Sequence, residues 1–174
     1  MRPKRTAFVA DEIERACVEL LSEKYFLDIT VTDIVAKAGV ARVSFYRNYS
    51  SLDDVLESVI RRILTGLMEE VWPALDTGEE RLWREFLFRF IFLVSDSNNR
   101  IAAVRPENLP VIFSKINNMK ILEELTERMD TRQKYRSTGI MAMITSVIQQ
   151  WLNDGRKESP EEMVDLLMEL IRES

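Results

Sequence analysis

The stretch TVTDIVAKAGVARVSFYRNYSSLD, residues 30–53, decides how this chain folds near its N-terminus. Thr30, followed three residues later by Asp33, is typical of a capping box and predicts a short helix that ends at Ala38. Gly39 comes next, at a point where a tight turn between two helices requires a positive φ. The pattern therefore predicts two short helices joined by a glycine turn, which is the layout of a helix-turn-helix.

Helices flank this turn on both sides. The second short helix is expected over about residues 43–49, and Ser51 with Asp54 is typical of the cap of a long helix that ends before Pro73. Before the turn, apolar residues recur every three or four positions and predict a helix over about residues 7–25, with one buried face formed by Ile13, Ala16, Cys17, Leu20 and Leu21.

The rest of the chain also follows a helical pattern. Residues 72–78 cluster turn-forming types and mark a candidate boundary. In the next segment, Phe86, Phe88, Phe90 and Phe92 alternate as they would in a strand. However, Arg81, Glu85 and Arg89 form a charged stripe with a spacing of four residues, so we expect a mostly buried helix.

Three more helices are expected towards the C-terminus. Residues 96–108 are polar and irregular, which indicates a loop, and helices are predicted over about 109–128, 131–153 and 160–173. The last one has a strong start signal, because Ser159 supplies an N-cap, Pro160 fits the first helical position and Glu162 completes a capping box. The predicted fold class is therefore all-α.

Composition agrees with this fold class and excludes several others. The 174 residues are 46% hydrophobic and 30% charged, with only 5 Gly and 5 Pro, which suits long helices better than a turn-rich β fold. No apolar run approaches the roughly 20 residues that a membrane span needs, so we expect a cytoplasmic protein. Cys17, the one cysteine, lies on the apolar face of its helix and is interpreted as a buried structural thiol.

The distribution of charge points to a nucleic-acid partner although the net charge is −5. Residues 1–62 carry ten basic and ten acidic side chains, so the excess of acid lies in the remainder. Residues 34–52 contain Lys37, Arg42 and Arg47 and no acid. A local basic face on an acidic protein is typical of a DNA reader, although a solvated surface without acids would show the same charge pattern.

These motifs resemble the tetracycline-repressor (TetR) family of bacterial regulators. The resemblance rests on Thr30–Ile34, Ala38–Val40 and Phe45–Tyr49, followed by Ser51 and Asp53, and it covers about residues 13–59. It implies a homodimer whose third helices enter successive major grooves of pseudo-palindromic double-stranded DNA. It also implies transcriptional regulation, more often repression, and release by a small apolar or amphipathic ligand.

The resemblance and the chemistry of the side chains suggest a DNA-contact role for each exposed position. Base reading is assigned to Arg42, whose guanidinium can bond guanine O6 and N7, and to Val43 and Asn48. Contacts to the DNA backbone are assigned to Lys4, Arg5, Thr30, Thr32, Ser44, Tyr46 and Arg47. Phe45 and Tyr49 are interpreted as core residues, because they lie on the face opposite Arg42, and Lys37 as a solvated charge.

Two positions depart from the family pattern. Leu52 stands where members usually carry a lysine that contacts phosphate, so one ion pair per half-site is expected to be absent. Ala41 replaces the hydroxyl residue expected to cap the third helix, a loss of about 1 kcal/mol in typical hosts. Both changes affect the expected DNA affinity more than the expected function.

We divide the chain into a DNA-binding domain (1–52), a connecting helix and linker (53–78) and a helical body for ligand binding and dimerisation (79–174). We expect six residues of the body either to line an apolar ligand cavity or to belong to an ordinary core: Trp83, Phe86, Phe90, Phe113, Met141 and Met143. By the family resemblance the last two helices pair with their symmetry mates, through Ile144, Ile148, Trp151, Met163, Leu167 and Leu170.

Two other classes of function compete with a DNA-binding regulator. The chain has no histidine, no glycine-rich phosphate loop and no cysteine cluster, so an enzyme is not expected, and neither a cofactor nor a metal. The alternative is an interaction module that keeps the scaffold and acts on DNA architecture or on another protein without control by a ligand.

Overall fold

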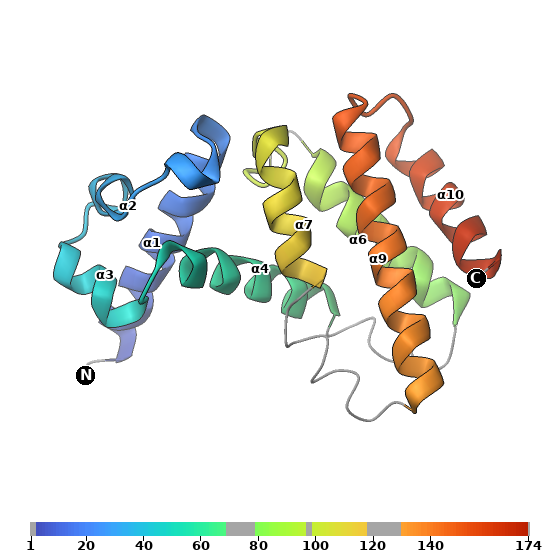
Figure 1. The fold of residues 1–174 in the computed structure, drawn as a ribbon, viewed down its shortest axis with the longest axis horizontal. Helices are drawn as coiled ribbons and strands as arrows, with labels where there is room; N and C mark the ends of the chain where they lie inside the picture. Colours follow the sequence, from blue (N-terminus) through green and yellow to red (C-terminus); the bar gives the residue numbers. More distant parts are fainter. Residues whose placement is uncertain (1–2, 69–78, 97–98, 118–129, 174) are drawn as a thin grey trace.

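The computed structural model describes residues 3–68, 79–96, 99–117 and 130–173, and all regular elements within these ranges are helices. Figure 1 shows an elongated molecule with a small helical group at the N-terminal end and a larger helical body at the other. The N-terminal group consists of α1 (Pro3–Glu23), η1 (Phe26–Asp28), α2 (Val31–Ala38) and α3 (Arg42–Asn48). The predicted all-α fold class is confirmed.

A long helix leads from the N-terminal group into the body (Figure 1). This helix is α4 (Leu52–Met68), and the predicted cap at its start is present: Ser51 Oγ accepts from Asp54 N–H at 3.1 Å, while Asp54 Oδ2 accepts from Ser51 N–H. The predicted boundary at 72–78 lies outside the described residues. The body contains α6 (Glu80–Ser95), η2 (Pro106–Asn108), α7 (Leu109–Asn117), α9 (Thr131–Asn153) and α10 (Pro160–Glu173).

Helix α1 forms the centre of the N-terminal group. It begins four residues earlier than predicted and ends at Glu23, two residues before the predicted end. The apolar face predicted for it is buried, as is Cys17, and burial raises the pKa of the Cys17 thiol to about 12. The thiol therefore stays protonated near neutral pH, and its predicted burial is confirmed.

The turn between α2 and α3 has the predicted geometry. Thr30 Oγ1 accepts a hydrogen bond from Asp33 N–H at 3.2 Å, and Asp33 Oδ2 accepts one from Thr30 N–H at 2.8 Å, so the capping box is complete. Gly39 ends α2 in the left-handed conformation, with φ of 66°. An L side chain at this position would be strained, which is why the sequence carries glycine here.

The carboxylate of Asp33 should make α2 sensitive to acid. A hydrogen bond from Lys24 and two from Thr30 lower the pKa of Asp33 from 3.8 to about 2. Because the folded-state pKa lies below the unfolded one, this stabilisation is complete above about pH 5 and is lost as the pH falls through about 4 towards 2. In urea denaturation, the wild type should exceed Asp33→Asn in stability by a constant margin at neutral pH and by a shrinking margin below pH 4. A margin independent of pH would contradict this account.

In the body, the segment with alternating phenylalanines is a helix, as predicted. Trp83, Phe86 and Phe90 of α6 point into the core, whereas Phe88 and Phe92 stack on each other on its outer side. Helices α9 and α10 have the predicted bounds. Residues 96–108 form a loop that ends in η2, with 97–98 outside the described residues, and the predicted helix 109–128 is described only as far as Asn117.

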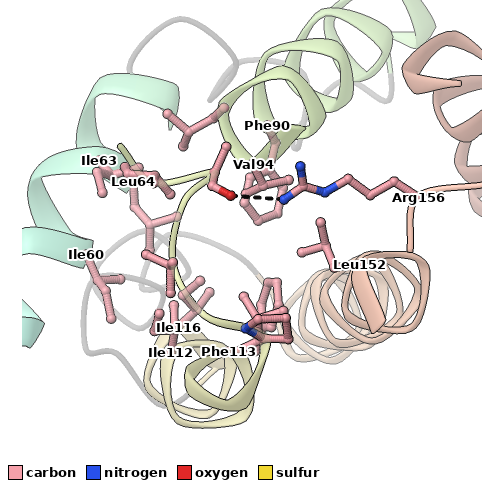
Figure 2. A pocket seen from close by; sticks show the side chains of 16 residues that line it. Ile60, Ile63, Leu64, Phe90, Val94, Ile112, Phe113, Ile116, Leu152 and Arg156 are labelled. Carbon is pink, nitrogen blue, oxygen red and sulfur yellow. Dashed lines mark hydrogen bonds between the residues drawn. The ribbon is translucent and has the colours of Figure 1, made fainter. Parts of the chain in front are cut away.

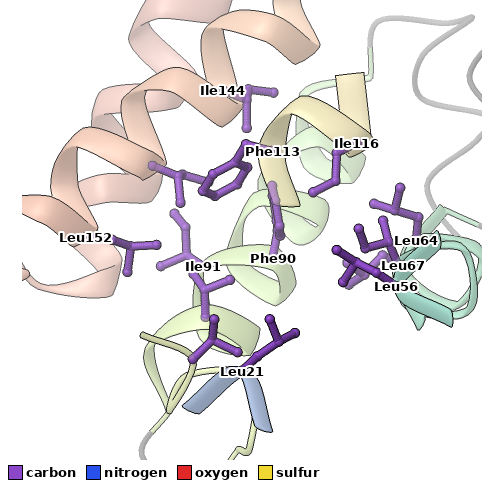
Figure 3. Packing of buried hydrophobic residues seen from close by; sticks show 14 of the residues in the cluster. Leu21, Leu56, Leu64, Leu67, Phe90, Ile91, Phe113, Ile116, Ile144 and Leu152 are labelled. Carbon is purple, nitrogen blue, oxygen red and sulfur yellow. The ribbon is translucent and has the colours of Figure 1, made fainter. Parts of the chain in front are cut away.

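Figure 3 shows how the elements share one apolar core, in which Leu21 of α1 reaches towards α6 and Phe113 of α7 lies between α6 and α9. Ion pairs add to the packing at the surface, for example Arg84 with Asp165 at 2.7 Å between α6 and α10. None of the helices in the described part of the chain is long and apolar enough to cross a membrane.

Candidate DNA-binding surface and ligand cavity

One buried aromatic ring anchors the short helix α3. Phe45 is 0% exposed and contacts Tyr46 edge to face, with ring centroids 5.3 Å apart, and Tyr49 at 6.2 Å. A seven-residue helix is not stable by itself, so this packing holds it in place. With Phe45 facing inward, the opposite face is exposed, including Val43 at 57% and Tyr46 at 51%.

The structure brings three of the predicted DNA contacts together. Arg42 Nη1 donates to Thr32 Oγ1 and Nη2 donates to Tyr46 Oη, both at 3.2 Å, and the guanidinium lies 5.6 Å from the centroid of the Tyr46 ring. Thr32 belongs to α2 and the other two to α3, so this group spans the two helices of the motif. All three side chains are exposed, so DNA could replace these long hydrogen bonds at small cost.

Other predicted contacts are partly engaged within the protein. Asn48 is half-buried and donates from Nδ2 to Ser44 O at 2.7 Å, and Thr30 Oγ1 takes part in the capping box. Arg47 is exposed in the last turn of α3. Helix α1 includes positions 4 and 5, but the side chains of Lys4 and Arg5 lie outside the described residues.

The two departures from the family pattern have visible consequences. Ala41 occupies the N-cap of α3 without any side-chain hydrogen bond, as predicted. Leu52 is half-buried and packs against the core, so it occupies a structural position. Lys37, interpreted as a solvated charge, forms an ion pair with Glu23.

A buried acidic group beneath α3 was not predicted. Glu14 is 5% exposed, and its Oε1 accepts hydrogen bonds from Tyr49 Oη and from Ser58 Oγ, both at 2.7 Å. Its Oε2 makes no aligned hydrogen bond but lies 2.7 Å from Arg62 Nη2 as an ion pair. Burial, and then the bond to Glu14, raise the pKa of Tyr49 to about 12. The sequence signal for this buried group was the position of Glu14, an acid next to Ile13 on the apolar face of α1.

A small apolar cavity lies in the body (Figure 2). Its volume is about 80 Å³, and it is bounded by α4, α6, α7, the C-terminal end of α9 and the segment 101–109. Of the predicted pocket residues, Phe90 and Phe113 line it, whereas Trp83, Phe86, Met141 and Met143 are not among the lining residues. Those four point into packed core or lie beside it.

Arg156 is the one charged residue among those that line the cavity. Its Nη2 donates to Ala102 O at 3.0 Å (Figure 2), and its backbone has φ of 57°, which is uncommon for a residue other than glycine. The backbone bends here because Gly155 and Arg156 end α9 with N–H groups that donate to Leu152 O and Trp151 O. No sequence signal points to Arg156, since a lone arginine after a glycine carries no pattern.

The residues assigned to a dimer interface are largely buried within the single chain. Five of them contact the body's own core and have little exposed surface: Ile144, Ile148, Trp151, Met163 and Leu167. Only Leu170 keeps partial exposure. Burial within one chain leaves these five side chains little surface for a second chain, and the interface assignment stays a prediction. A dimer through α9 and α10 would use their outer residues, such as Leu166.

Fold and surface together define a helix-turn-helix protein with a helical body. Residues 110–173 match the family model described as "Transcriptional regulator C-terminal region". The helix-turn-helix regulator YvdT of Bacillus subtilis, which is uncharacterised, is 30% identical over 114 residues, or 64% of this chain. The chain spans 58% of the length of YvdT and 43% of that of YxbF, a second B. subtilis regulator of this type.

Solved structures show the same fold. A TetR-family regulator from Streptomyces coelicolor has a TM-score of 0.67 at 16% identity, covering 97% of this chain and 95% of that one. FadR from Bacillus subtilis, solved in complex with stearoyl-CoA, has a TM-score of 0.63 at 18% identity, covering 92% and 96%. The chain is therefore similar to TetR-family transcriptional regulators, in the sequence of its C-terminal region and in its fold.

Proposed function

We propose that this protein is a sequence-specific DNA-binding regulator that binds a pseudo-palindromic operator as a homodimer. The observation that carries the proposal is the exposed group of Arg42, Thr32 and Tyr46 on a helix-turn-helix whose residues 34–52 include no acid. Helix α3 has the size to enter a major groove, where Arg42 would bond guanine O6 and N7.

The neighbouring side chains suit the remaining contacts. Val43 presents an exposed apolar surface that can pack on a thymine methyl, and Arg47 an exposed charge for a phosphate. Asn48 would have to give up its bond to Ser44 O before it could reach a base. The protein is then expected to repress transcription from sites in chromosomal DNA, and a cytoplasmic location follows from the same proposal.

The test is selection of bound duplexes from a random DNA library at near-physiological salt, followed by sequencing. An enriched inverted repeat would support a dimeric, sequence-specific regulator. Affinity for that repeat should fall steeply with added salt while the preference over random DNA stays large. A protein that enriches no sequence would favour the alternative, an interaction module without sequence preference.

We further propose that an amphipathic ligand with an anionic group regulates DNA binding. Ligand pockets usually measure about 300–1,000 Å³, so a cavity of about 80 Å³ must expand to hold such a molecule. Its walls include Ile60 and Leu64 of α4, which leads to the DNA-binding domain, so expansion would act on that helix. The complex of the related FadR with stearoyl-CoA supports an acyl chain as the ligand class.

Arg156 should provide the charge selectivity of this site. We expect Arg156→Met to weaken binding of dodecanoate on the order of tenfold, because a charge-assisted hydrogen bond is lost. Binding of dodecanol, which has the same chain and no charge, should be unchanged. Both are measured by quenching of tryptophan fluorescence. An equal loss of affinity for the two ligands would show that the substitution damages the cavity. Unchanged affinity for both would show that Arg156 does not take part in the site.

A further inference from the structure

A fully buried asparagine in the body is bonded to the end of α1. Asn108 of η2 is 0% exposed, and its Oδ1 accepts a hydrogen bond from Phe26 N–H at 2.7 Å. Its Nδ2 donates to Leu21 O at 2.8 Å and to Lys24 O at 2.9 Å. More than 80 positions of the sequence separate the partners, so one side chain joins the body to the DNA-binding domain.

Arg105 reinforces this joint. Its backbone N–H donates to Leu21 O at 3.1 Å and its Nη1 donates to Glu23 O at 3.2 Å. The last carbonyls of a helix have no partner within the helix, and here Arg105 and Asn108 satisfy two of those of α1, Leu21 O and Glu23 O. We call these two residues the clamp.

The clamp gives the DNA-binding domain a second attachment. In the described part of the chain, α4 is the one continuous helix that leads from the domain to the body. A domain attached through a single helix can pivot about it, whereas a second fixed point removes that freedom. Surface ion pairs, such as Arg100 with the partly buried Glu19, also cross the joint, but pairs of this kind contribute little and are screened by salt.

We propose that Asn108 is a positioning residue that fixes the angle of the helix-turn-helix on the body, and thereby the half-site spacing that the dimer accepts. This inference rests on the proposed function. In a two-fold dimer, the two copies of α3 must lie about one turn of DNA, roughly 34 Å, apart. A joint that holds the two DNA-binding domains at this distance before binding avoids the entropy cost of ordering them on the DNA. It also disfavours operators with another half-site spacing.

The test compares the wild type with Asn108→Ala on two operators, the selected repeat and the same repeat with one base pair inserted at its centre. The wild type should bind the inserted site far more weakly. Asn108→Ala should bind the selected site more weakly than the wild type, and its discrimination between the two sites should fall on the order of tenfold. Hydrogen exchange at the Phe26 amide, which donates to Asn108, shows whether the clamp has opened.

A variant that only loses stability, and keeps the clamp, should give a different result. Met168→Ala removes a fully buried side chain of α10 and leaves the clamp intact, so it serves as a matched destabilised control. All proteins are compared at a temperature at which circular dichroism shows them folded. The control should keep the wild-type discrimination between the two sites.

Unchanged discrimination in Asn108→Ala, together with fast exchange of the Phe26 amide, would overturn the proposal. If Asn108→Ala does not fold, Arg105→Ala keeps the bonds of Asn108 and removes the bond to Glu23 O. It should reduce the discrimination in the same direction, and no reduction would count against the clamp. A wild type that selects no DNA site refutes the proposed function, and the inference falls with it. A wild type that binds, with variants that discriminate equally well, refutes the clamp alone.

Discussion

Replacing Phe45 with alanine should lower the free energy of unfolding by about 3–5 kcal/mol, the usual cost of removing a buried phenylalanine side chain. Phe45 is completely buried, and it anchors a helix too short to persist without such packing. Because α3 carries the proposed reading residues, DNA binding should be lost with it. Urea denaturation followed by circular dichroism measures the first effect, and operator binding measures the second.

The neighbouring residue provides the control. Tyr46 touches the Phe45 ring but is half exposed, so Tyr46→Ala should change stability by only about 0.5 kcal/mol. It should still weaken DNA binding, because Tyr46 lies on the proposed contact surface. If Phe45→Ala destabilised the protein no more than Tyr46→Ala does, Phe45 would not be the anchor of α3.

Replacing Arg42 with alanine should relax base preference at one position in each half-site. A bidentate contact between arginine and guanine contributes about 1–3 kcal/mol of discrimination, or roughly 5- to 150-fold. The expected result is therefore a large loss of affinity for the selected site and a small loss for sites that carry another base at that position. Binding is measured on a set of operators that differ at each position in turn. Unchanged preference at every position would rule out Arg42 as a reading residue.

Arg47 is the matched control for Arg42, since it has the same side chain and is exposed on the same helix. If it contacts phosphate, Arg47→Ala should weaken all sequences alike and should reduce the dependence of affinity on salt. A change of base preference in Arg47→Ala would mean that Arg47 is the reading residue and Arg42 the phosphate contact.

Short-range rules were enough to predict the local elements and the motif. The capping pair Thr30 and Asp33, the positive φ at Gly39 and the cap at Ser159 each act within a few residues, so their effect on the backbone can be predicted from neighbours alone. The same holds for the fold class, and for Phe45, whose place on the inner face of α3 follows from helical spacing. These short-range rules also suffice to bring Arg42 to the exposed side.

Contacts between helices, and not helical spacing, determine which apolar residues face a cavity and which face the core. Phe86 and Phe90 share one helix face, yet only Phe90 lines the cavity, because the other wall comes from α4, α7 and the segment 101–109. Ile144 likewise has a pattern equally suited to a dimer interface or to a core, and its burial within one chain follows from contacts with other helices. Periodicity predicts that a side chain is buried but does not identify what covers it.

Polar joints between distant segments were also decided by the tertiary structure. Glu14 meets Tyr49 and Ser58 beneath α3, and Asn108 meets the end of α1 across more than 80 positions of the sequence. In the sequence, Asn108 is one more polar residue in a loop, and loops are usually exposed. Its importance arises because packing removes it from water, so that each of its polar atoms needs a partner. Two of these partners are the carbonyls of Leu21, in α1, and of Lys24, directly after α1.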